Sequence, residues 1–318
     1  MRKVLVCGAG GFIGNHLVRD LKQQGAWVIG ADIKQPEFGS SEADVFHQVD
    51  LRDQQLVDEI LTADITEIYQ LAADMGGAGY IFSGVNDADI MHNSAMINLN
   101  ILETMTRRGI QRVFYSSSAC IYPAHNQESA QDPVLSEHSA YPAAPDSEYG
   151  WEKLFSERLY QSFHKNYGID VRIARFHNVF GPGGAWQGGR EKAPAALCRK
   201  VAESPGTVEV WGPGTQTRSF LYITECLEGI RRLMASDYTQ PINIGSARMI
   251  SINDLVHLIA RIAGKEIQIH NIPGPMGVMG RTSDNTLIQQ VLGWQPPDRL
   301  EQGLTELYQW IQQQRAAQ

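Results

Sequence analysis

The sequence has little of what marks several large classes of protein. Its 318 residues include only four cysteines, which lie far apart and form no CxxC pair. We therefore expect no metal site and no secreted disulfide framework. Basic residues are also few, with 27 Lys and Arg against 35 Asp and Glu, for a net charge of -8. A nucleic acid or a membrane surface is not expected as the main partner, because either would select a basic excess.

Long apolar runs are absent as well. No stretch approaches the ~20 apolar residues of a membrane span. The first expected strand begins within a few residues of the start, which leaves no room for a signal peptide, so we expect a cytoplasmic protein. The rest of the composition is typical of a globular enzyme, with 43% hydrophobic and 19% charged residues. At roughly 150 residues per domain, the length predicts about two domains or one large one.

Short β-rich runs alternate with helical patterns through the first half. The expected strands are Lys3–Cys7, Trp27–Asp32, Val45–Asp50, Glu67–Leu71, Arg112–Ser116 and Val171–Phe176. The expected helices between them are Phe12–Gln23, Leu51–Leu61 and Met91–Arg108. Strands that alternate with helices form parallel sheets through right-handed crossovers. The pattern therefore predicts a doubly wound α/β fold with a parallel sheet.

The pattern changes after about Phe180. Residues Gly181–Gly189 are too rich in glycine for a regular element and are predicted to form a loop. Later elements are expected as a helix from about Arg190, a strand at Val208–Trp211, helices near Thr224–Ala235 and Ile252–Ala263, and a returning strand at Pro241–Gly245. We predict a nucleotide-binding domain over residues 1–180. Residues 181–318 would form a smaller mixed α/β domain, mainly for the substrate, from which the chain partly crosses back to the sheet.

A glycine-rich motif, Gly8-Ala9-Gly10-Gly11-Phe12-Ile13-Gly14, joins the first expected strand to the first helix. Such glycines let a backbone approach a pyrophosphate at a helix N-terminus, although tight turns also use glycine for purely structural reasons. Asp32 ends the next strand about 20 residues on, where a carboxylate can bind a ribose 2′-hydroxyl. That charge would repel a 2′-phosphate, so NAD is predicted over NADP. Asp53 is predicted near the adenine, with a helix cap as the alternative.

Tyr149 and Lys153 lie four residues apart, on one face of an expected helix. A phenol is a weak base near neutral pH, with a pKa of about 10, but a nearby ammonium favours the phenolate. The same spacing also fits an ordinary solvated helix pair. Upstream, Ser116-Ser117-Ser118 follows a central strand and is expected to bring a hydroxyl beside Tyr149.

At this point the chain resembles the extended short-chain dehydrogenase/reductase family of nucleotide-sugar enzymes. The resemblance rests on the glycine motif, Leu71-Ala72-Ala73, the serine strand, Tyr149 with Lys153, and the segment Arg175–Pro182. It implies a Rossmann domain with a small sugar-nucleotide domain, and a homodimer formed through a helix bundle. It also implies that Tyr149 is the base, that Lys153 contacts the tyrosine and the nicotinamide ribose, and that Ser118 is the hydroxyl partner.

Three longer segments, Ala72–Tyr80, Ser118–Pro123 and Gly188–Ala195, resemble family members that epimerise GDP-D-mannose at C3 and C5. The implied reaction oxidises C4, which makes the C3 and C5 protons acidic, exchanges them, and then returns the hydride. Cys120 would be the base and Lys192 the acid of that exchange. The alternatives are an inert core cysteine for Cys120 and, for Lys192, a solvated cation in the first turn of a helix.

The same resemblance implies a set of residues that contact a GDP-sugar. They are Gly77, Ser118, Ala119, Cys120, Asn178, Glu191, Lys192, Ala193, Lys200, Gln216, Arg218 and Arg281. Arginine suits the diphosphate because its planar guanidinium binds oxygens in pairs. Ordinary surface roles stay open for Lys200 and Gln216.

Other functions stay open alongside this one. The protein could act on a related sugar nucleotide such as a GDP-heptose, or be a UDP-sugar 4-epimerase, a 4,6-dehydratase or a non-catalytic NAD-binding regulator. Dehydratases of the family typically place an Asp-Glu pair after the hydroxyl residue, whereas Ala119-Cys120 follows Ser118 here. A 4-epimerase needs neither Cys120 nor Lys192. The intact set of reactive residues argues against a regulator.

Overall fold

The early strands are apolar on both faces, as strands are when helices cover a parallel sheet on two sides. The computed structural model describes residues 2–133, 135–275 and 277–318. Its main sheet has seven strands in the order β11-β6-β5-β4-β1-β2-β3, and all neighbours are parallel. The bounds are β1 (Lys3–Cys7), β2 (Trp27–Asp32), β3 (Val45–Gln48), β4 (Glu67–Gln70), β5 (Arg112–Ser118), β6 (Asp170–Phe176) and β11 (Ile242–Ile244). The predicted doubly wound α/β fold is confirmed.

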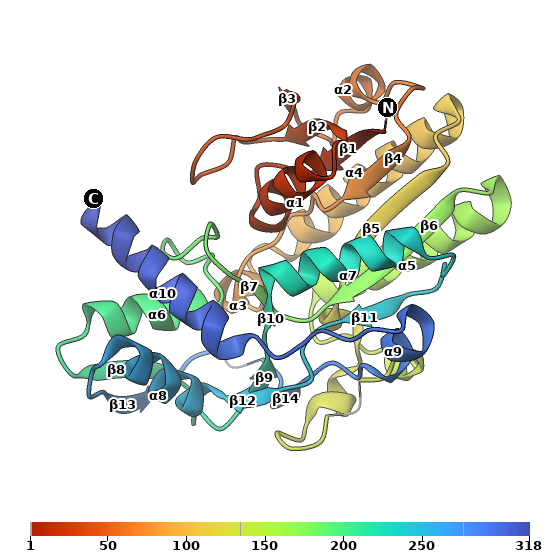
Figure 1. The fold of residues 1–318 in the computed structure, drawn as a ribbon. Coiled ribbons are helices and arrows are strands. Elements are labelled where there is room, and N and C mark those ends of the chain that lie inside the picture. Colours follow the sequence, from red (N-terminus) through yellow and green to blue (C-terminus); the bar gives the residue numbers. More distant parts are fainter. Residues whose placement is uncertain (1, 134, 276) are drawn as a thin grey trace.

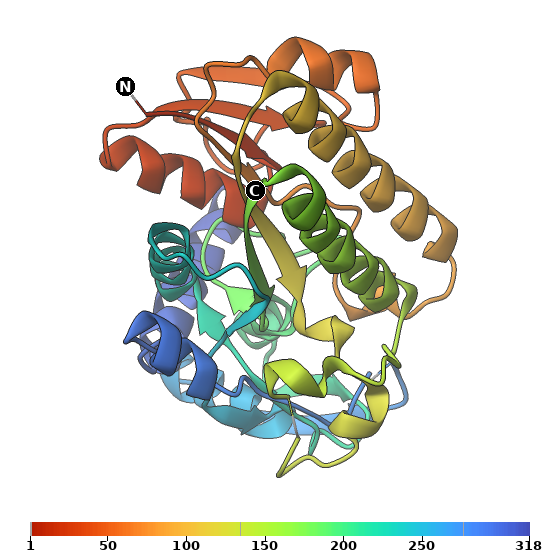
Figure 2. The ribbon, with the colours of Figure 1, turned by 90° about the vertical axis from the view of Figure 1, so that its right-hand side faces the viewer.

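Helices cover both faces of this sheet (Figure 2). On one side lie α1 (Phe12–Gln23) and α7 (Ile223–Ala235), and on the other α2 (Gln54–Ile60), α4 (Asp87–Arg108) and α5 (Glu148–Tyr167). Alternate residues of β1 point into the two layers, because successive side chains of a strand face opposite ways. Val4 and Val6 join one apolar cluster, and Leu5 and Cys7 join the other.

The order of the strands also determines where a ligand can bind. The chain winds outward from β1 to β3 and then returns to place β4 on the other side of β1. Such a reversal leaves a crevice at the carboxyl ends of the strands. The glycine motif after β1, Asp32 at the end of β2 and Ser118 at the end of β5 all lie along that edge.

Most of the chain after Phe180 forms a second lobe below the strand ends (Figure 1). Helices α6 (Ala193–Glu203), α8 (Ile252–Ala263) and α10 (Leu300–Ala316) pack on one another there. Small sheets join them, from β7 (Val179–Phe180), β8 (Thr207–Trp211), β9 (Thr217–Ser219), β10 (Leu221–Tyr222), β12 (Met249–Ser251), β13 (Gln268–Ile272) and β14 (Gly280–Arg281). Strand β11 returns to the main sheet, as predicted for Pro241–Gly245.

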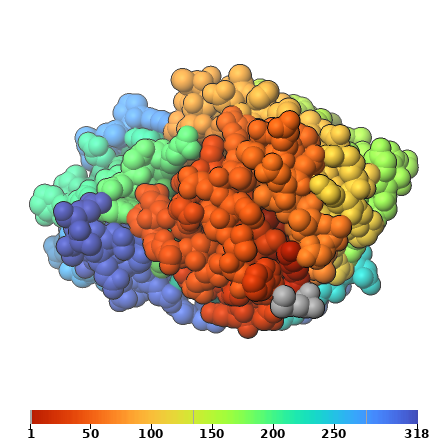
Figure 3. Space-filling model, turned by 90° about the horizontal axis from the view of Figure 1, so that it is seen from above, coloured from red at the N-terminus to blue at the C-terminus, as the bar shows by residue number. Residues whose placement is uncertain are grey.

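The end of the chain lies against the first lobe. The Trp310 ring of α10 meets the Phe38 ring edge-on, with centroids 4.9 Å apart. Seen from above, the blue atoms of α10 lie beside the red and orange atoms of the first fifty residues (Figure 3). No helix within the described ranges combines the length and apolar character that a bilayer span requires.

Several predicted boundaries shift for local reasons. The helix expected from about Arg190 begins at Ala193, because Pro194 favours the first turn of a helix and Lys192 before it is extended. The placement of Lys192 in the first turn is therefore wrong, since Lys192 is the N-cap. Helix α2 begins later than predicted because Asp53 caps it. Strand β5 extends beyond the predicted Ser116 because Ser117 and Ser118 still pair with β6.

The remaining elements had not been predicted. Most are too short for a periodic signal, namely β7, β9, β10, β12, β14, α3 (Ala78–Ile81), α9 (Thr286–Leu292) and the 3-10 turns η1 (Ala119–Ile121), η2 (Ala124–Gln127) and η3 (Glu137–Ala140). Helix α10 is long, and Leu304, Leu307, Tyr308 and Ile311 give it a buried apolar face at helical spacing. That spacing was a usable signal in the sequence.

Candidate active site

The glycine motif forms a close backbone cradle at the start of α1. Gly8 has a left-handed φ of 83°, and a Cβ at Gly14 would lie 2.0 Å from the Gly8 carbonyl oxygen. Gly11 is the N-cap of α1, so Phe12 and Ile13 are its first two residues. The N–H groups of a first helical turn have no partner inside the helix and are suited to bind phosphate oxygens.

Asp32 lies beside this cradle at the end of β2. Its Oδ2 accepts a hydrogen bond from Gly10 N at 2.9 Å, and its Oδ1 accepts one from Lys34 N at 3.1 Å. Burial raises the pKa of this carboxyl, whereas these backbone N–H groups and the Lys34 charge lower it. The cradle, the helix N-terminus and a carboxylate at the next strand end together fit the phosphates and a ribose of NAD.

Tyr149 meets the end of β5 because α5 packs directly on the backbone of η1. A Cβ at Gly150 would lie 2.2 Å from the Cys120 carbonyl oxygen, so glycine is required for this approach. Ser147 caps α5, its hydroxyl accepting from Gly150 N at 3.3 Å. The Tyr149 phenol hydrogen bonds with Ser118, whose hydroxyl also accepts from Cys120 N at 3.2 Å. The predicted pairing of Tyr149 with a strand-end serine is present in the structure.

Lys153 is buried below the tyrosine. Its Nζ donates to the Ser116 carbonyl oxygen at 2.9 Å and lies 5.7 Å from the centre of the Tyr149 ring. Burial lowers the pKa of Lys153, and Glu152 and Glu157 oppose that effect. Burial, with a smaller contribution from Cys120, raises the pKa of Tyr149, and the Ser118 hydrogen bond and Arg281 oppose it. Burial therefore outweighs the lowering of the Tyr149 pKa that the nearby ammonium was expected to cause.

Cys120 lies on η1 with a relative exposure of 9%. The side chains that interact with it electrostatically come from several elements and include Tyr149, Lys153, Lys192, Arg218 and Arg281. Lys192 interacts with Cys120 and with Cys226, and burial lowers the pKa of its ammonium. The fold therefore brings the predicted base and acid into one site, although 72 residues separate them in the sequence.

The other predicted substrate residues lie on two sides of this group. A Cβ at Gly77 would lie 2.4 Å from the Glu191 carbonyl oxygen, so these two backbones touch. Glu191 accepts from Gly189 N at 2.7 Å, and Ala193 begins α6 directly after Lys192. Asn178 has a left-handed φ of 41° and donates to the Ser219 carbonyl at 2.9 Å.

Gln216, Lys200 and Arg218 follow in the second lobe. Gln216 is 4% exposed and uses its Nε2 on the Trp211 carbonyl, while its buried Oε1 has no partner within the described residues. Lys200 donates to the Glu209 carbonyl at 2.8 Å. Burial and Arg281 lower the pKa of Arg218 to about 10.

Comparison with known proteins gives the family. Residues 4–245 match the NAD dependent epimerase/dehydratase family. The chain belongs to this family. A relative from Arabidopsis thaliana, named GDP-mannose 3,5-epimerase, is 48% identical over 314 residues, which cover 98% of this chain and 82% of the relative.

Solved structures agree with this membership. A UDP-glucuronic acid 4-epimerase from Bacillus cereus, in complex with UDP-glucuronic acid and NAD, is 27% identical with a TM-score of 0.82, and the match covers 98% of this chain and 99% of that one. A UDP-glucose 4-epimerase from Thermotoga maritima has the same fold, with 24% identity, a TM-score of 0.86 and the same shares covered. NAD is the cofactor of the family, and the cradle at Gly8–Gly14 fits it.

Two residues that hold this epimerase-family site together were missed in the sequence. Asp146 and Gln127 both accept hydrogen bonds from Arg281. Asp146 precedes Ser147, the cap of α5, which is a weak signal because it also fits an ordinary helix start. Gln127 gives no sequence signal, since its side chain is buried at the end of a short 3-10 turn.

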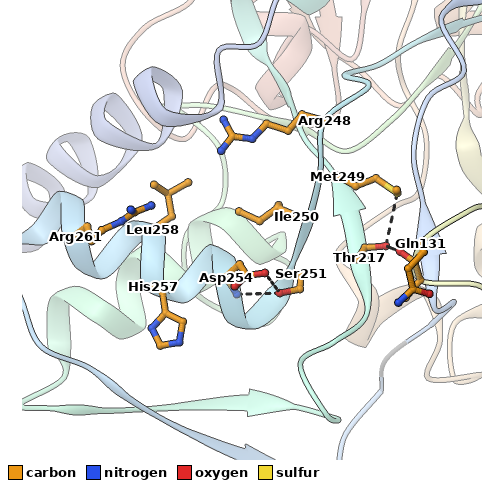
Figure 4. A pocket seen from close by; sticks show the side chains of 11 residues that line it. Gln131, Thr217, Arg248, Met249, Ile250, Ser251, Asp254, His257, Leu258 and Arg261 are labelled. Carbon is orange, nitrogen blue, oxygen red and sulfur yellow. Dashed lines mark hydrogen bonds between the residues drawn. The ribbon is translucent and has the colours of Figure 1, made fainter.

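A hollow of about 720 Å³ lies between β9, β12 and α8, apart from the residues around Cys120 (Figure 4). Thr217, Arg248, Ser251, His257 and Arg261 are among its lining residues. Successive side chains of a strand point to opposite faces. Thr217 therefore faces this hollow, while Arg218, the next residue of β9, faces the side on which Cys120 lies. None of the predicted site residues lines this hollow.

Replacing Asp32 with alanine should weaken NAD binding by roughly 10- to 100-fold, the usual effect of losing hydrogen bonds to a charged group. The carboxylate orders the glycine motif through Gly10 N and is available to a ribose hydroxyl. Calorimetric titration of the stripped protein with NAD measures the effect. Unchanged affinity would mean that another group binds the ribose.

Asp53→Asn tests the adenine prediction. The Asp53 side chain accepts from Gln55 N at 2.8 Å and from Leu56 N at 3.4 Å, so it caps α2. Asparagine caps helices about as well as aspartate. NAD affinity should stay unchanged if the cap is its only role, and should fall if Asp53 also contacts adenine.

Proposed function

We propose that the protein epimerises GDP-D-mannose at C3 and C5, giving GDP-L-galactose and GDP-L-gulose by transient oxidation at C4. The supporting observation is that Lys192 lies close enough to Cys120 to interact with it electrostatically, and that Cys120 interacts in the same way with Tyr149, the partner of Ser118. An additional acid and base are needed only where carbon-bound protons are exchanged, so a simple 4-epimerase has no use for them. The 48% identity with a relative named GDP-mannose 3,5-epimerase supports the choice of sugar nucleotide.

The first task of the site is proton removal from the C4 hydroxyl. Tyr149 accepts this proton in its phenolate form, and Ser118 orients the phenolate oxygen through their hydrogen bond. Bound NAD supplies reversible hydride transfer at C4, and the residues suited to hold it are the glycine motif, Asp32 and Lys153. Once C4 is a ketone, the protons on C3 and C5 become acidic because the negative charge left behind is shared with the carbonyl oxygen.

The second task is exchange of a proton between the two faces of the sugar ring. Cys120 removes a proton from the ring carbon, and Lys192 delivers one from the opposite face. Burial lowers the pKa of Lys192 from the ordinary value of 10.5, which makes its ammonium a better acid near neutral pH. Exchange with solvent then restores the thiolate and the ammonium before the next exchange.

The GDP-sugar is held mainly by the second lobe in this proposal. Its contacts are Gly77, Ala119, Asn178, Glu191, Ala193, Lys200, Gln216 and Arg218. The unpartnered Oε1 of Gln216 is a buried acceptor suited to a sugar or ribose hydroxyl. Residues 1–180 would thus serve NAD and residues 181–318 mainly the sugar nucleotide, in a cytoplasmic enzyme.

Incubation with GDP-mannose in D2O tests the function directly. NMR and mass analysis of the recovered sugar nucleotides should find deuterium at C3 and C5, with the original hydrogen retained at C4. Label at C5 alone would limit the enzyme to the gulose product. Absence of label would overturn the proposal, and the same assay on a GDP-heptose and on UDP-sugars would then identify the substrate.

We also propose that the protein is a homodimer that pairs through α4 and α5. These helices lie side by side on the outer face of the sheet (Figure 2) and expose apolar side chains at Leu99, Trp151 and Phe155. Phe155 is 46% exposed in the middle of α5, and apolar side chains that gather on one exposed face are typical of a protein interface.

Phe155→Glu should weaken the dimer roughly 10-fold or more, because it places a charge in an apolar contact. Sedimentation velocity over a concentration series measures the change. Val85→Glu is the control, since Val85 is 83% exposed and lies outside α4 and α5. A Phe155→Glu variant that sediments like the wild type would exclude this interface.

A further inference from the structure

Arg281 is fixed against the thiol of Cys120. Its Nη1 donates to Cys120 Sγ at 3.0 Å, its Nη2 donates to Asp146 Oδ2 at 3.0 Å, and its Nε donates to Gln127 Oε1 at 2.6 Å. The residue is only 6% exposed. All three nitrogens of the guanidinium therefore have protein partners, and each partner comes from a different segment of the chain.

This arrangement is built by the surrounding backbone. Arg281 lies on β14, which pairs with β9. A Cβ at Gly280 would lie 2.0 Å from the Ser129 carbonyl oxygen, so the strand is pressed against the segment that follows Gln127. Asp146 is also buried, with a side-chain exposure of 9%, directly before the cap of α5. The guanidinium therefore has little freedom to move.

The geometry commits most of the Arg281 guanidinium to protein partners. Arginine binds phosphate best with two neighbouring N–H groups that point the same way. Here Nη1 already donates to Cys120, Nη2 donates to Asp146, and Nε donates to Gln127. Three of its five N–H groups are thus engaged, which leaves one on Nη1 and one on Nη2.

Cys120 lies in surroundings that are mainly positively charged. Lys153 of α5, Lys192 at the N-cap of α6, Arg218 of β9 and Arg281 of β14 all act on the thiol, together with the phenol of Tyr149. Asp146 pairs with Arg281 and so offsets part of this positive charge. A cationic environment favours a thiolate, and a hydrogen bond from a guanidinium stabilises it further.

We propose that Arg281 is a positioning residue that holds Cys120 as a thiolate and aims its sulfur at the sugar ring, with Asp146 and Gln127 fixing the guanidinium. The proposal rests on the proposed function. During exchange the C–H bond next to the C4 ketone breaks, an S–H bond forms on Cys120, and the electron pair passes into the enolate. Arg281 keeps its protons throughout, so the thiol proton leaves to solvent when the thiolate is restored.

Alkylation of Cys120 by iodoacetamide tests this role without depending on turnover. The rate is followed over a pH series on the purified holoenzyme, by mass spectrometry of the peptide that contains Cys120. The other three cysteines are fully buried, and burial raises the pKa of Cys7, Cys198 and Cys226, so they should react slowly. Arg281→Gln should move the alkylation profile to higher pH and slow the reaction near neutral pH roughly 10- to 100-fold.

Arg281→Lys keeps the charge but loses the fixed fork, so its profile should lie between those of the wild type and Arg281→Gln. It also serves as the second variant if Arg281→Gln does not fold. In that case its alkylation must still begin at a higher pH than that of the wild type. Arg248→Gln is the control, because Arg248 pairs with Asp298 at the surface, away from the thiol. Its alkylation profile should match that of the wild type.

A wild-type alkylation profile in folded Arg281→Gln would overturn the proposal. If that variant instead lost affinity for GDP-mannose, Arg281 would be a substrate-binding residue. Failure of the proposed function gives a different result. In that case the wild-type enzyme exchanges no sugar protons, yet the difference in alkylation between wild type and Arg281→Gln is still measured.

Discussion

Cys120→Ser is expected to slow deuterium uptake at C3 and C5 of GDP-mannose by about 10²- to 10⁴-fold, the usual effect of removing a general base. Serine keeps nearly the same shape and can still accept a hydrogen bond from Arg281. A hydroxyl is far less acidic than a thiol, so it does not provide the anion that removes the proton. NMR of the sugar nucleotides after incubation in D2O measures the loss. NAD binding and C4 oxidation should persist, because Tyr149 and Ser118 are unchanged.

Lys192→Ala separates the two halves of the proposed acid–base pair. Without the acid, Cys120 can still remove a proton and return a deuteron to the same face. This variant should therefore incorporate deuterium with little inversion, whereas Cys120→Ser should show neither. Cys198→Ser is the control for substitution of a cysteine, since Cys198 is fully buried in α6 and has no proposed role. Wild-type exchange in Cys120→Ser would remove the thiol from the mechanism.

Several helices and strands were predictable from local sequence. The β1 and β2 strands, α1 and α8 have the expected bounds because their apolar periodicity is undisturbed and clear turn or cap residues flank them. The two- and three-residue strands of the second lobe could not be predicted. Their pairing depends on contacts between distant segments, such as Arg281 with Arg218, and short strands give no periodic signal.

The chemistry of the site was predictable only in part. Tyr149 and Lys153 share a helix, and their spacing alone places them on one face. The meeting of Cys120 with Arg281 depends on how the second lobe folds back, across 161 residues of sequence. Arg281 was predicted to bind substrate, and its hydrogen bonds to Gln127 and Asp146 could not be inferred from its surroundings in the sequence.

Tyr149→Phe is expected to slow C4 oxidation by about 10²- to 10⁴-fold, because the proton of the C4 hydroxyl then has no phenolate oxygen to accept it. The loss also removes the partner of the Ser118 hydroxyl. Rapid mixing of the NAD-loaded protein with GDP-mannose, followed by the near-ultraviolet absorbance of the reduced cofactor, measures this step. Tyr160→Phe is a matched control, since Tyr160 is buried in the same helix and its hydroxyl donates to Asn98 at 3.1 Å.

Oxidation at C4 must come before proton exchange at C3 and C5, so Tyr149→Phe tests both steps of the proposed mechanism. Protons on C3 and C5 become acidic only after C4 is a ketone, so Tyr149→Phe should lose deuterium exchange along with oxidation, even though Cys120 and Lys192 are intact. Cys120→Ser should still form the reduced cofactor and the ketone. Deuterium exchange in Tyr149→Phe at the wild-type rate would mean that another group accepts the C4 hydroxyl proton. Ser118, already within hydrogen-bonding contact of that phenol, would be the next residue to replace.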